Sequence, residues 1–286
     1  MDELSVTWRP SYERSVRLTV EQHLMPSFGG CQLPAVDRRA GMRFRAGLAQ
    51  RADLSPARVN RIFGLLRTIT HEAAERYRLH RPFEHVRALP EQRPRIEALN
   101  KSEVDQFLLA VRPNYQTYYL LRFSSGMRTA EVDALAARHV DVSTGTVSVE
   151  RAVVDGALGP LKNEYAEREV QIPRRTAVEL GRLIAGKQPD DLLFATRTGR
   201  PRDARTVSKR VWRPTLERAG LPIVTAYSTR HTAASLWLAA GESPLWVARQ
   251  LGHSDPETLY RRYARYIPGM LPQQGQKANS VWERAA

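Results

Sequence analysis

Three prolines in one short stretch constrain this chain most, because they divide it in two. All three fall within residues 81–95, where each resists the continuation of a helix. With 286 residues, the chain is long enough to build more than one hydrophobic core. We therefore predict one domain over residues 1–88, a linker over residues 89–96 and a second domain over residues 97–286.

An excess of basic residues points to a polyanionic partner. The chain carries 44 Lys and Arg against 30 Asp and Glu, a formal net charge of +14, and only five of the 44 are lysine. Arginine forks onto phosphate through two N–H groups at once, which suits contacts to a DNA backbone. An anionic membrane surface as a partner, or an arginine-rich solvated surface with none, gives the same excess. Since the basic residues are spread over both predicted domains, we expect both to touch DNA.

Composition also argues against several classes of protein. No apolar run reaches the roughly 18 to 20 residues that cross a bilayer, and the acidic N-terminus does not resemble a secretory signal. Cys31 is the only cysteine, which excludes an intrachain disulfide and a zinc site built on cysteines. No cluster of Asp and Glu suggests a metal. We expect no membrane contact, no metal and no cofactor, and a bacterial cytoplasmic, nucleoid-associated protein.

The first predicted domain has the apolar periodicity of helices. Ser55-Pro56 is a strong helix start, with Ser as N-cap and Pro at the first helical position. Apolar residues then recur at helical spacing: Val59, Ile62, Phe63, Leu66, Ile69 and Ala73. The opposite face carries Arg58, Arg61 and Arg67 together with Asn60. We predict that these three arginines contact DNA phosphates, although an ordinary amphipathic helix has the same pattern. Weaker periodicity predicts helices over residues 11–24 and 35–49.

The second predicted domain opens with helices. Ser102 can cap the first of them, with Asp105 as the acidic partner of a capping box. A further helix is expected over residues 116–124, stopped near Gly126, and another over residues 129–138.

The period then changes to that of strands. Residues 145–150 and 168–172 alternate between apolar and polar side chains, and residues 155–167 hold the glycines and proline of a connecting turn. From residue 175 onward the pattern is again mostly helical. The expected fold class is mainly α with a small antiparallel β-sheet.

Three short segments, far apart in the sequence, carry the residues with chemical potential. They read SGMRTAEV at residues 125–132, AYSTRHT at residues 226–232, and LGHSDP running on to YARY at residues 251–266. Each alone is a weak signal. Together, in this order, they resemble the catalytic domain of the tyrosine recombinase family, which includes phage and mobile-element integrases. The resemblance covers about residues 99–267, and the first domain is similar to the family's helical core-binding domain in general pattern.

The resemblance implies a role for each matched residue. Arg128 and Arg230 are the two arginines that bind the scissile phosphate, and His253 hydrogen-bonds it. Lys162, in the turn between the strands, is the lysine that protonates the leaving 5′-oxygen. Taken singly, these residues also fit ordinary places: a surface or ion-paired arginine, a solvated loop lysine, a turn histidine.

The same resemblance makes Tyr263 the nucleophile and gives Glu131 the acidic position that orients the site. Tyr227 stands where the family usually has the histidine of a His-x-x-Arg pattern. A neutral histidine accepts a proton near pH 7 and a tyrosine does not do so comparably, so the acceptor of the nucleophile's proton stays open. His231, one residue past Arg230, is expected to pack structurally.

The expected chemistry explains why these residue types are wanted. Attack on a phosphodiester builds negative charge on its non-bridging oxygens, which two planar guanidinium groups stabilise. A phenol, with a pKa of about 10, needs a proton acceptor or a positive field to become a nucleophile. The leaving alkoxide needs a proton, which a lysine ammonium supplies.

Helical spacing alone does not choose the nucleophile. Tyr260, Tyr263 and Tyr266 are three residues apart and share one face if the helix continues. Tyr263 is preferred because it lies ten residues past His253 and precedes Ala-Arg, as in similar integrases. Aromatic packing is the expectation for the other two.

The resemblance implies a site-specific recombinase that cleaves and rejoins double-stranded DNA through a 3′-phosphotyrosyl intermediate, as a homotetramer, for integration or excision of a phage or mobile element. Two alternatives stay open: a catalytically degenerate DNA-binding accessory protein, and a type IB topoisomerase that cleaves without site specificity. The tail, residues 268–286, is expected either to pack on a neighbouring subunit or to be disordered. No N-terminal arm-binding domain is evident, which fits a truncated chain or a simpler recombinase.

Overall fold

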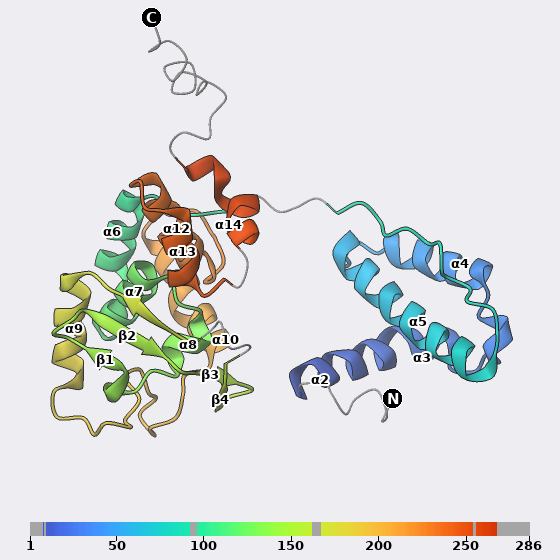
Figure 1. The fold of residues 1–286 in the computed structure, drawn as a ribbon, viewed down its shortest axis with the longest axis horizontal. Helices are drawn as coiled ribbons and strands as arrows, with labels where there is room; N and C mark the ends of the chain where they lie inside the picture. Colours follow the sequence, from blue (N-terminus) through green and yellow to red (C-terminus); the bar gives the residue numbers. More distant parts are fainter. Residues whose placement is uncertain (1–7, 9, 92–95, 162–166, 254–255, 268–286) are drawn as a thin grey trace, which may run out of the picture. The chain divides into compact units, whose positions relative to one another are not determined.

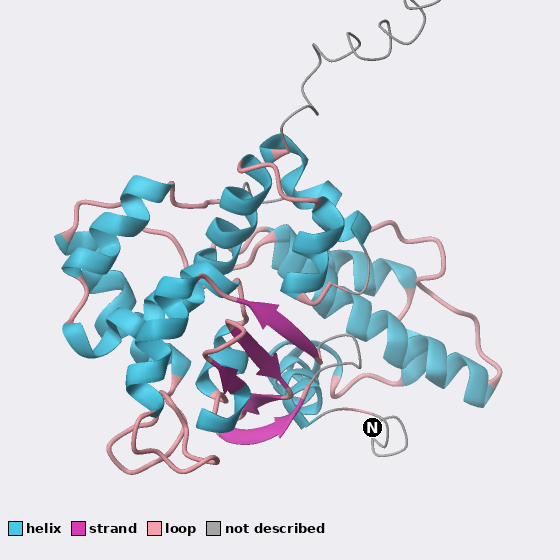
Figure 2. Ribbon diagram, turned by 60° about the vertical axis from the view of Figure 1, so that its left-hand side comes forward, coloured by secondary structure: helices cyan, strands magenta, loops and turns pink. Residues whose placement is uncertain are grey.

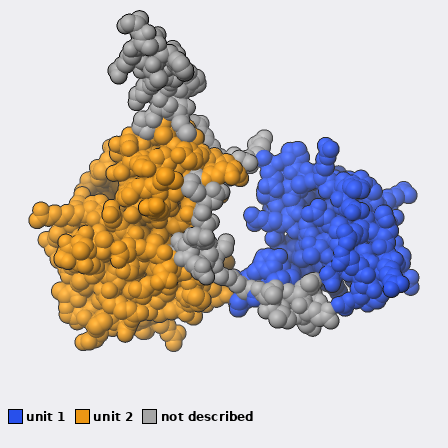
Figure 3. Space-filling model, viewed as in Figure 1, with its two compact units in different colours: residues 1–94 blue, residues 95–286 orange. Residues whose placement is uncertain are grey.

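A computed structural model gives the fold and describes residues 8, 10–91, 96–161, 167–253 and 256–267 (Figure 1). The chain forms two compact units, residues 1–94 and residues 95–286 (Figure 3). This division falls inside the stretch expected to be a linker. Helices dominate, and the strands of the described residues are antiparallel and belong to unit 2. The predicted fold class is confirmed.

Unit 1 is built from helices. α2 (Pro10–Thr19) runs through a π-helical turn (Val20–Leu24) into α3 (Met25–Phe28), and a 3-10 turn (Leu33–Ala35) precedes α4 (Arg38–Ala49) and α5 (Pro56–Tyr77). The Ser55 hydroxyl caps α5 by accepting from the backbone N–H of Arg58, as predicted. The helices expected over residues 11–24 and 35–49 are present, the second beginning at residue 38 because Asp37 caps it.

The apolar face of α5 forms the core of unit 1. Its buried side chains Val59, Ile62, Phe63 and Leu66 pack with Leu24, Leu48 and Phe83. Asn60, which the sequence places with the arginines on the polar face, instead binds the chain that follows the helix. Its side-chain amide donates to the Leu89 carbonyl at 2.9 Å, and its carbonyl accepts from the Leu89 N–H at 2.8 Å. The described part of the linker is thereby fixed against α5.

Unit 2 opens with α6 (Lys101–Ala110), which is capped by Asn100. Its side chain accepts from the backbone N–H of Glu103 at 2.9 Å, and the Glu103 carboxylate accepts from the backbone N–H of Asn100 at 2.7 Å. The capping box predicted from Ser102 and Asp105 is therefore wrong, because the extended backbone already ends at Asn100. α7 (Pro113–Ser125) stops at Gly126, whose φ of 61° suits glycine.

The helix predicted over residues 129–138 ends early. α8 covers only Thr129–Asp133, and a 3-10 turn (Ala137–His139) follows. Between them the backbone pairs with a distant segment: the Leu193 N–H donates to the Leu135 carbonyl at 2.9 Å, and the Ala137 N–H donates to the Asp191 carbonyl at 3.0 Å. Tertiary pairing overrides helical propensity here.

A three-stranded antiparallel sheet has the order β1-β2-β5 and contains both predicted strands: β1 (Val140–Asp141), β2 (Thr146–Val149) and β5 (Arg168–Gln171). Val147 lies opposite Val170. A hairpin that the sequence analysis missed, β3 (Arg151–Val154) and β4 (Ala157–Pro160), turns at Asp155-Gly156, both with positive φ. Asp-Gly between apolar residues is a strong hairpin signal, so this element was within reach of the sequence.

Helices complete unit 2 (Figure 2): α9 (Arg174–Ile184), α10 (Ala204–Val207), a π-helical turn (Ser208–Trp212), α11 (Arg213–Arg218), α12 (Ser228–Ala239), α13 (Pro244–Leu251), α14 (Pro256–Tyr263) and a 3-10 turn (Ala264–Tyr266). One apolar core joins the three-stranded sheet to the helices around it. A smaller core joins α12, α13 and α14, which lie together in Figure 1. Within the described ranges, no helix is long and apolar enough to cross a membrane.

Candidate active site

Arg230 joins the three sequence motifs. It lies in the first turn of α12, and its side chain is almost fully buried at 1% exposure. One terminal nitrogen donates to the Gly126 carbonyl at 2.9 Å and the other to the Leu251 carbonyl at 2.6 Å. Burial lowers the pKa of Arg230 to about 10, so the guanidinium is still charged at neutral pH. A buried cation is thus held where α7, α12 and α13 meet.

Arg128 and Glu131 lie at the start of α8. The Glu131 carboxylate accepts from the backbone N–H of Arg128 at 2.8 Å and from its guanidinium at 2.7 Å. A second guanidinium nitrogen of Arg128 donates to the Gly252 carbonyl at 3.3 Å. Glu131 is buried, whereas the Arg128 side chain is 36% exposed. Arg128 is therefore fixed from beneath and keeps an accessible face.

Arg168, at the start of β5, is a member of this site that the sequence analysis missed. Its guanidinium donates to the Glu131 carboxylate at 2.9 Å and to the Gln250 carbonyl at 2.8 Å. Its side chain is 8% exposed. The alternating pattern of residues 168–172 gave no reason to separate this arginine from any other strand residue, because only the fold brings it beside Glu131.

Glu131 balances the charge of these arginines. Burial alone raises its pKa, but the hydrogen bond and charge of Arg168, together with those of Arg128, outweigh burial and leave the pKa below its ordinary value. The carboxylate is thus ionised at neutral pH.

Gly252 allows the close approach of two of these groups. Its φ is +64°, and a Cβ there would lie 2.9 Å from the Arg168 guanidinium. Its carbonyl accepts from Arg128. Both the conformation and the space at this position therefore favour glycine.

His253 follows Gly252 and is half-buried. Burial, and then the charges of Arg230 and Arg128, lower the pKa of His253 to about 3, so the ring is neutral at neutral pH. Its Nδ1 is buried and has no hydrogen-bond partner among the described residues. A neutral imidazole among guanidinium groups retains the capacity to bind a phosphate oxygen through one N–H.

Tyr263, the last residue of α14, is distinguished from its neighbours by burial. It is 1% exposed and belongs to the core between α12, α13 and α14, whereas Tyr260 is 37% exposed. The hydroxyl of Tyr266 instead accepts from Arg265 at 2.9 Å. Burial raises the pKa of Tyr263 above its ordinary value, against the opposing charge of Arg230. Its hydroxyl lies 2.5 Å from Nδ1 of His231.

The expectation that His231 only packs is therefore wrong. Tyr227 and His231 are four residues apart on the first turns of α12, so they share a face of the helix. Their rings meet edge to face with centroids 5.0 Å apart. Tyr227 lies at the exposed end of this pair, with 42% exposure, and His231 lies deeper, against Tyr263.

The remaining candidates lie elsewhere. Lys162 falls outside the described residues; β4 ends at Pro160, two positions before it. In unit 1, Arg61 and Arg67 are exposed on α5. Arg58 is half-buried and donates to the Thr19 hydroxyl at 3.2 Å.

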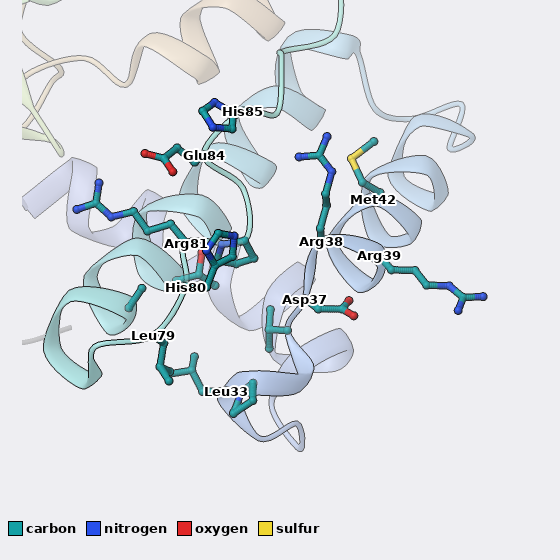
Figure 4. A pocket seen from close by; sticks show the side chains of 15 residues that line it. Leu33, Asp37, Arg38, Arg39, Met42, Leu79, His80, Arg81, Glu84 and His85 are labelled. Atoms are coloured by element: carbon teal, nitrogen blue, oxygen red, sulfur yellow. The ribbon is translucent and has the colours of Figure 1, made fainter.

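The largest cavity does not involve the predicted residues. It has a volume of about 770 Å³ and lies in unit 1, where Asp37, Arg38, Arg81, Glu84 and His85 are among the side chains that line it (Figure 4). In the described part of the chain, no group of three or more His, Cys, Asp or Glu side chains is placed to hold a metal ion.

Solved structures show which fold class this arrangement belongs to. The Tn1549 transposon integrase in complex with a circular intermediate DNA matches with a TM-score of 0.81 at 15% identity, over 99% of this chain and 96% of that one. A lambda integrase dimer bound to a core site matches with a TM-score of 0.70 at 15% identity, over 92% and 90% of the two chains.

The sequence comparisons define the family. Residues 97–268 match the model described as "Phage integrase family". This chain belongs to the phage integrase family, and the resemblance to tyrosine recombinases is confirmed.

Individual relatives are more distant. Prophage integrase IntR of Escherichia coli (strain K12) is 28% identical over 220 residues, which are 68% of this chain and 53% of that protein. The ICEBs1 integrase of Bacillus subtilis (strain 168) is 20% identical over 96% of this chain and 78% of that protein. The chain spans about half the length of the first of these relatives.

Proposed function

We propose that this protein is a site-specific DNA recombinase that cleaves and rejoins DNA strands through a covalent 3′-phosphotyrosyl bond to Tyr263. The observation that carries the proposal is the meeting of three distant motifs in one hydrogen-bonded site. Arg230 binds the carbonyls of Gly126 and Leu251, and Arg128 binds that of Gly252. Surface arginines that matched the family pattern by chance would not converge on one another's segments in this way.

The two arginines bind the scissile phosphate. Each guanidinium has five N–H groups, and the contacts to Gly126 and Leu251 use two of those of Arg230. The remaining donors face the charge that grows on the non-bridging oxygens during attack. Because the arginines are held by the protein before DNA arrives, little reorganisation is needed at the moment of reaction. His253 adds a neutral hydrogen-bond donor to the same phosphate.

The reaction needs no external energy. The Tyr263 oxygen attacks phosphorus, the bond to the 5′-oxygen breaks, and Lys162 protonates that oxygen. The phosphotyrosyl bond conserves the phosphodiester, so the 5′-hydroxyl of a second strand attacks it and restores the backbone. Tyr263 is then free for another round.

The partner is double-stranded DNA carrying a recombination site, held by both units. Unit 1 acts as the core-type DNA-binding domain, with Arg58, Arg61 and Arg67 against phosphates. A homotetramer brings two duplexes together and exchanges strands in pairs, for the integration or excision of a phage or mobile element. The protein acts where that DNA lies, in the bacterial nucleoid. The DNA named with the Tn1549 and lambda structures supports this choice of partner.

A nicked substrate tests the proposal. Duplexes tiled from the DNA on either side of the gene, each with a nick, let the short cleaved fragment diffuse away and trap the covalent intermediate. The wild-type protein is expected to form an adduct that survives denaturing electrophoresis, and Tyr263→Phe none, with both proteins binding the duplex. A wild type that binds but gives no adduct contradicts the proposal and favours an accessory DNA-binding role. Relaxation of a plasmid without the site favours topoisomerase activity instead.

A further inference from the structure

The hydroxyl of Tyr263 has a specific partner in the protein. It lies in a core of aliphatic side chains from α12, α13 and α14, and Nδ1 of His231 is 2.5 Å away. That distance is at the short end for a hydrogen bond from a hydroxyl. The ring centroids of the two residues are 5.7 Å apart, so the contact is made by the polar edges.

We propose that His231 is the general base that takes the proton of Tyr263 during strand cleavage and returns it during rejoining. This inference rests on the proposed function, since it assigns the proton acceptor of that same reaction. It departs from the sequence expectation, which left the acceptor open at Tyr227 and gave His231 a structural place.

Geometry separates His231 from Tyr227 as the candidate. Both lie on one face of α12, because residues four apart are neighbours on a helix. Tyr227 is at the exposed end, and its hydroxyl carries its own proton at neutral pH, so it donates better than it accepts. His231 is one turn deeper and already in hydrogen-bond contact with the phenol. A histidine at position 231 thus supplies the imidazole that position 227 lacks.

The protonation state of His231 suits this role. The charged and titratable groups around it are Tyr227 and Arg230 from α12 and Arg262 and Tyr263 from α14. Burial, and then the charges of Arg262 and Arg230, lower the pKa of His231 to about 4. The ring is therefore neutral at pH 7, and its Nε2–H tautomer accepts at Nδ1. A phosphate bound at Arg230 offsets part of that positive field, which raises the basicity of His231 when substrate is in place.

The proton balance closes over the two steps. In cleavage, the bond from the Tyr263 oxygen to phosphorus forms, the phenolic proton moves to Nδ1 of His231, and the bond to the 5′-oxygen breaks as that oxygen takes a proton from Lys162. In rejoining, the 5′-hydroxyl attacks phosphorus and gives its proton to Lys162. The imidazolium of His231 returns its proton to the departing phenolate. Both side chains end as they began.

The test measures single-turnover adduct formation on the nicked duplex that the wild type cleaves. His231→Gln keeps a polar side chain of similar reach but has no basic nitrogen, and is expected to slow cleavage by about 100-fold or more. Ser235→Ala is the matched control, one turn along α12, where the hydroxyl only bonds the His231 carbonyl. Thermal unfolding and binding of the same duplex by His231→Gln separate a chemical defect from misfolding.

Two further readouts distinguish a base from a positioning residue. A base must be neutral, so wild-type cleavage falls as pH drops through the pKa of His231 in the complex; His231→Gln loses that acid limb and speeds up with hydroxide instead. Added imidazole is expected to accelerate His231→Ala but not the wild type.

A third readout separates the base from the acid. A substrate whose leaving 5′-oxygen is replaced by sulfur needs no protonation of the leaving group, because a thiol has a pKa of about 8.5. It is expected to rescue Lys162→Ala and leave His231→Gln slow. A near wild-type rate for His231→Gln, or a slow variant with an unchanged pH profile and no rescue by imidazole, overturns the inference. Neither result bears on Tyr263, whose own test is the adduct formed by the wild type.

Discussion

Arginines serve this protein in two contrasting settings. On α5 of unit 1, Arg61 and Arg67 are exposed along one face of a long helix. In unit 2, Arg168 and Arg230 are buried and held by backbone carbonyls, and Arg168 also by Glu131. An exposed arginine adjusts to whatever phosphate it meets, and suits binding. A buried and anchored one has donors fixed in space, which suits stabilising one short-lived arrangement of charge.

The difference shows in what each setting requires of its surroundings. A solvated guanidinium needs no fixed partner, whereas a buried one is costly unless its hydrogen bonds are satisfied. Around Arg230 the protein provides two carbonyls, and around Arg128 and Arg168 it provides the ionised Glu131. Substitutions in the two settings should therefore fail in different ways, in chemistry or stability for unit 2 and in affinity for unit 1.

The largest effect is expected from Arg230→Lys, which keeps the charge and removes the fork. A single ammonium cannot bind the carbonyls of Gly126 and Leu251 and still present several donors to a phosphate. Adduct formation is expected to fall about 100- to 1000-fold, with duplex binding largely kept. The single-turnover rate checks this. A loss below tenfold would show that charge alone, as on α5, is enough at this position.

Glu131→Gln removes the carboxylate that the arginines share. It leaves two guanidinium groups without their buried counter-charge, which is expected to destabilise the protein by about 3 kcal/mol. Denaturant unfolding measures the change. Asp105→Asn breaks the exposed pair with Lys101 and serves as the control, with an expected cost of at most about 1 kcal/mol. Equal losses from the two variants would break the distinction between anchored and solvated arginines.

The same pair of proteins sharpens the comparison through pH. The folded pKa of Glu131 lies below its unfolded value, so its contribution to stability is present above the unfolded pKa, about 4.3. That contribution is lost as pH falls through the folded pKa. The stability gap between the wild type and Glu131→Gln is therefore expected to be full at pH 7 and to narrow below about pH 4. A gap that does not change with acid would mean that the carboxylate is not the group that matters.

Gly252→Ala tests how tightly Arg168 is held. Position 252 has a positive φ, and the added Cβ would also crowd the guanidinium. Gly186→Ala has a similar φ of +80° with no atom within 4 Å of its Cβ, so it isolates the backbone strain of about 1–2 kcal/mol. Unfolding measurements are expected to show a larger loss at 252 than at 186. The same loss at both would indicate that Arg168 moves aside at no cost.

The smallest effects are expected in unit 1. Arg61→Ala and Arg67→Ala should each weaken DNA binding to a similar extent whatever the sequence of the duplex, and lower the slope of log affinity against log salt by about one. Titrations at several salt concentrations measure this slope. A change confined to the cognate site would mean that these arginines read bases, and an unchanged slope would remove α5 from the interface.

Local patterns and long-range contacts were not equally accessible from the sequence. The helix after Ser55 and the strands around Val147 and Val170 follow from capping and alternation, which are local. α8 is shorter than its periodicity suggests because its following residues pair with residues 191–193. Arg168 and the bond between His231 and Tyr263 join positions 37 and 32 residues from their partners, and only the tertiary fold reveals them.

The central claim is that Tyr263 is the residue that becomes joined to DNA, and peptide mapping of the trapped adduct tests it directly. Trypsin separates the three candidate tyrosines, because arginines follow Tyr260 and flank the Tyr263-Ala-Arg segment on both sides. Mass spectrometry after nuclease trimming is expected to find the nucleotide on the peptide of residues 263–265. Attachment to the peptide that ends at Arg261, or to the one that begins at Tyr266, would contradict the account.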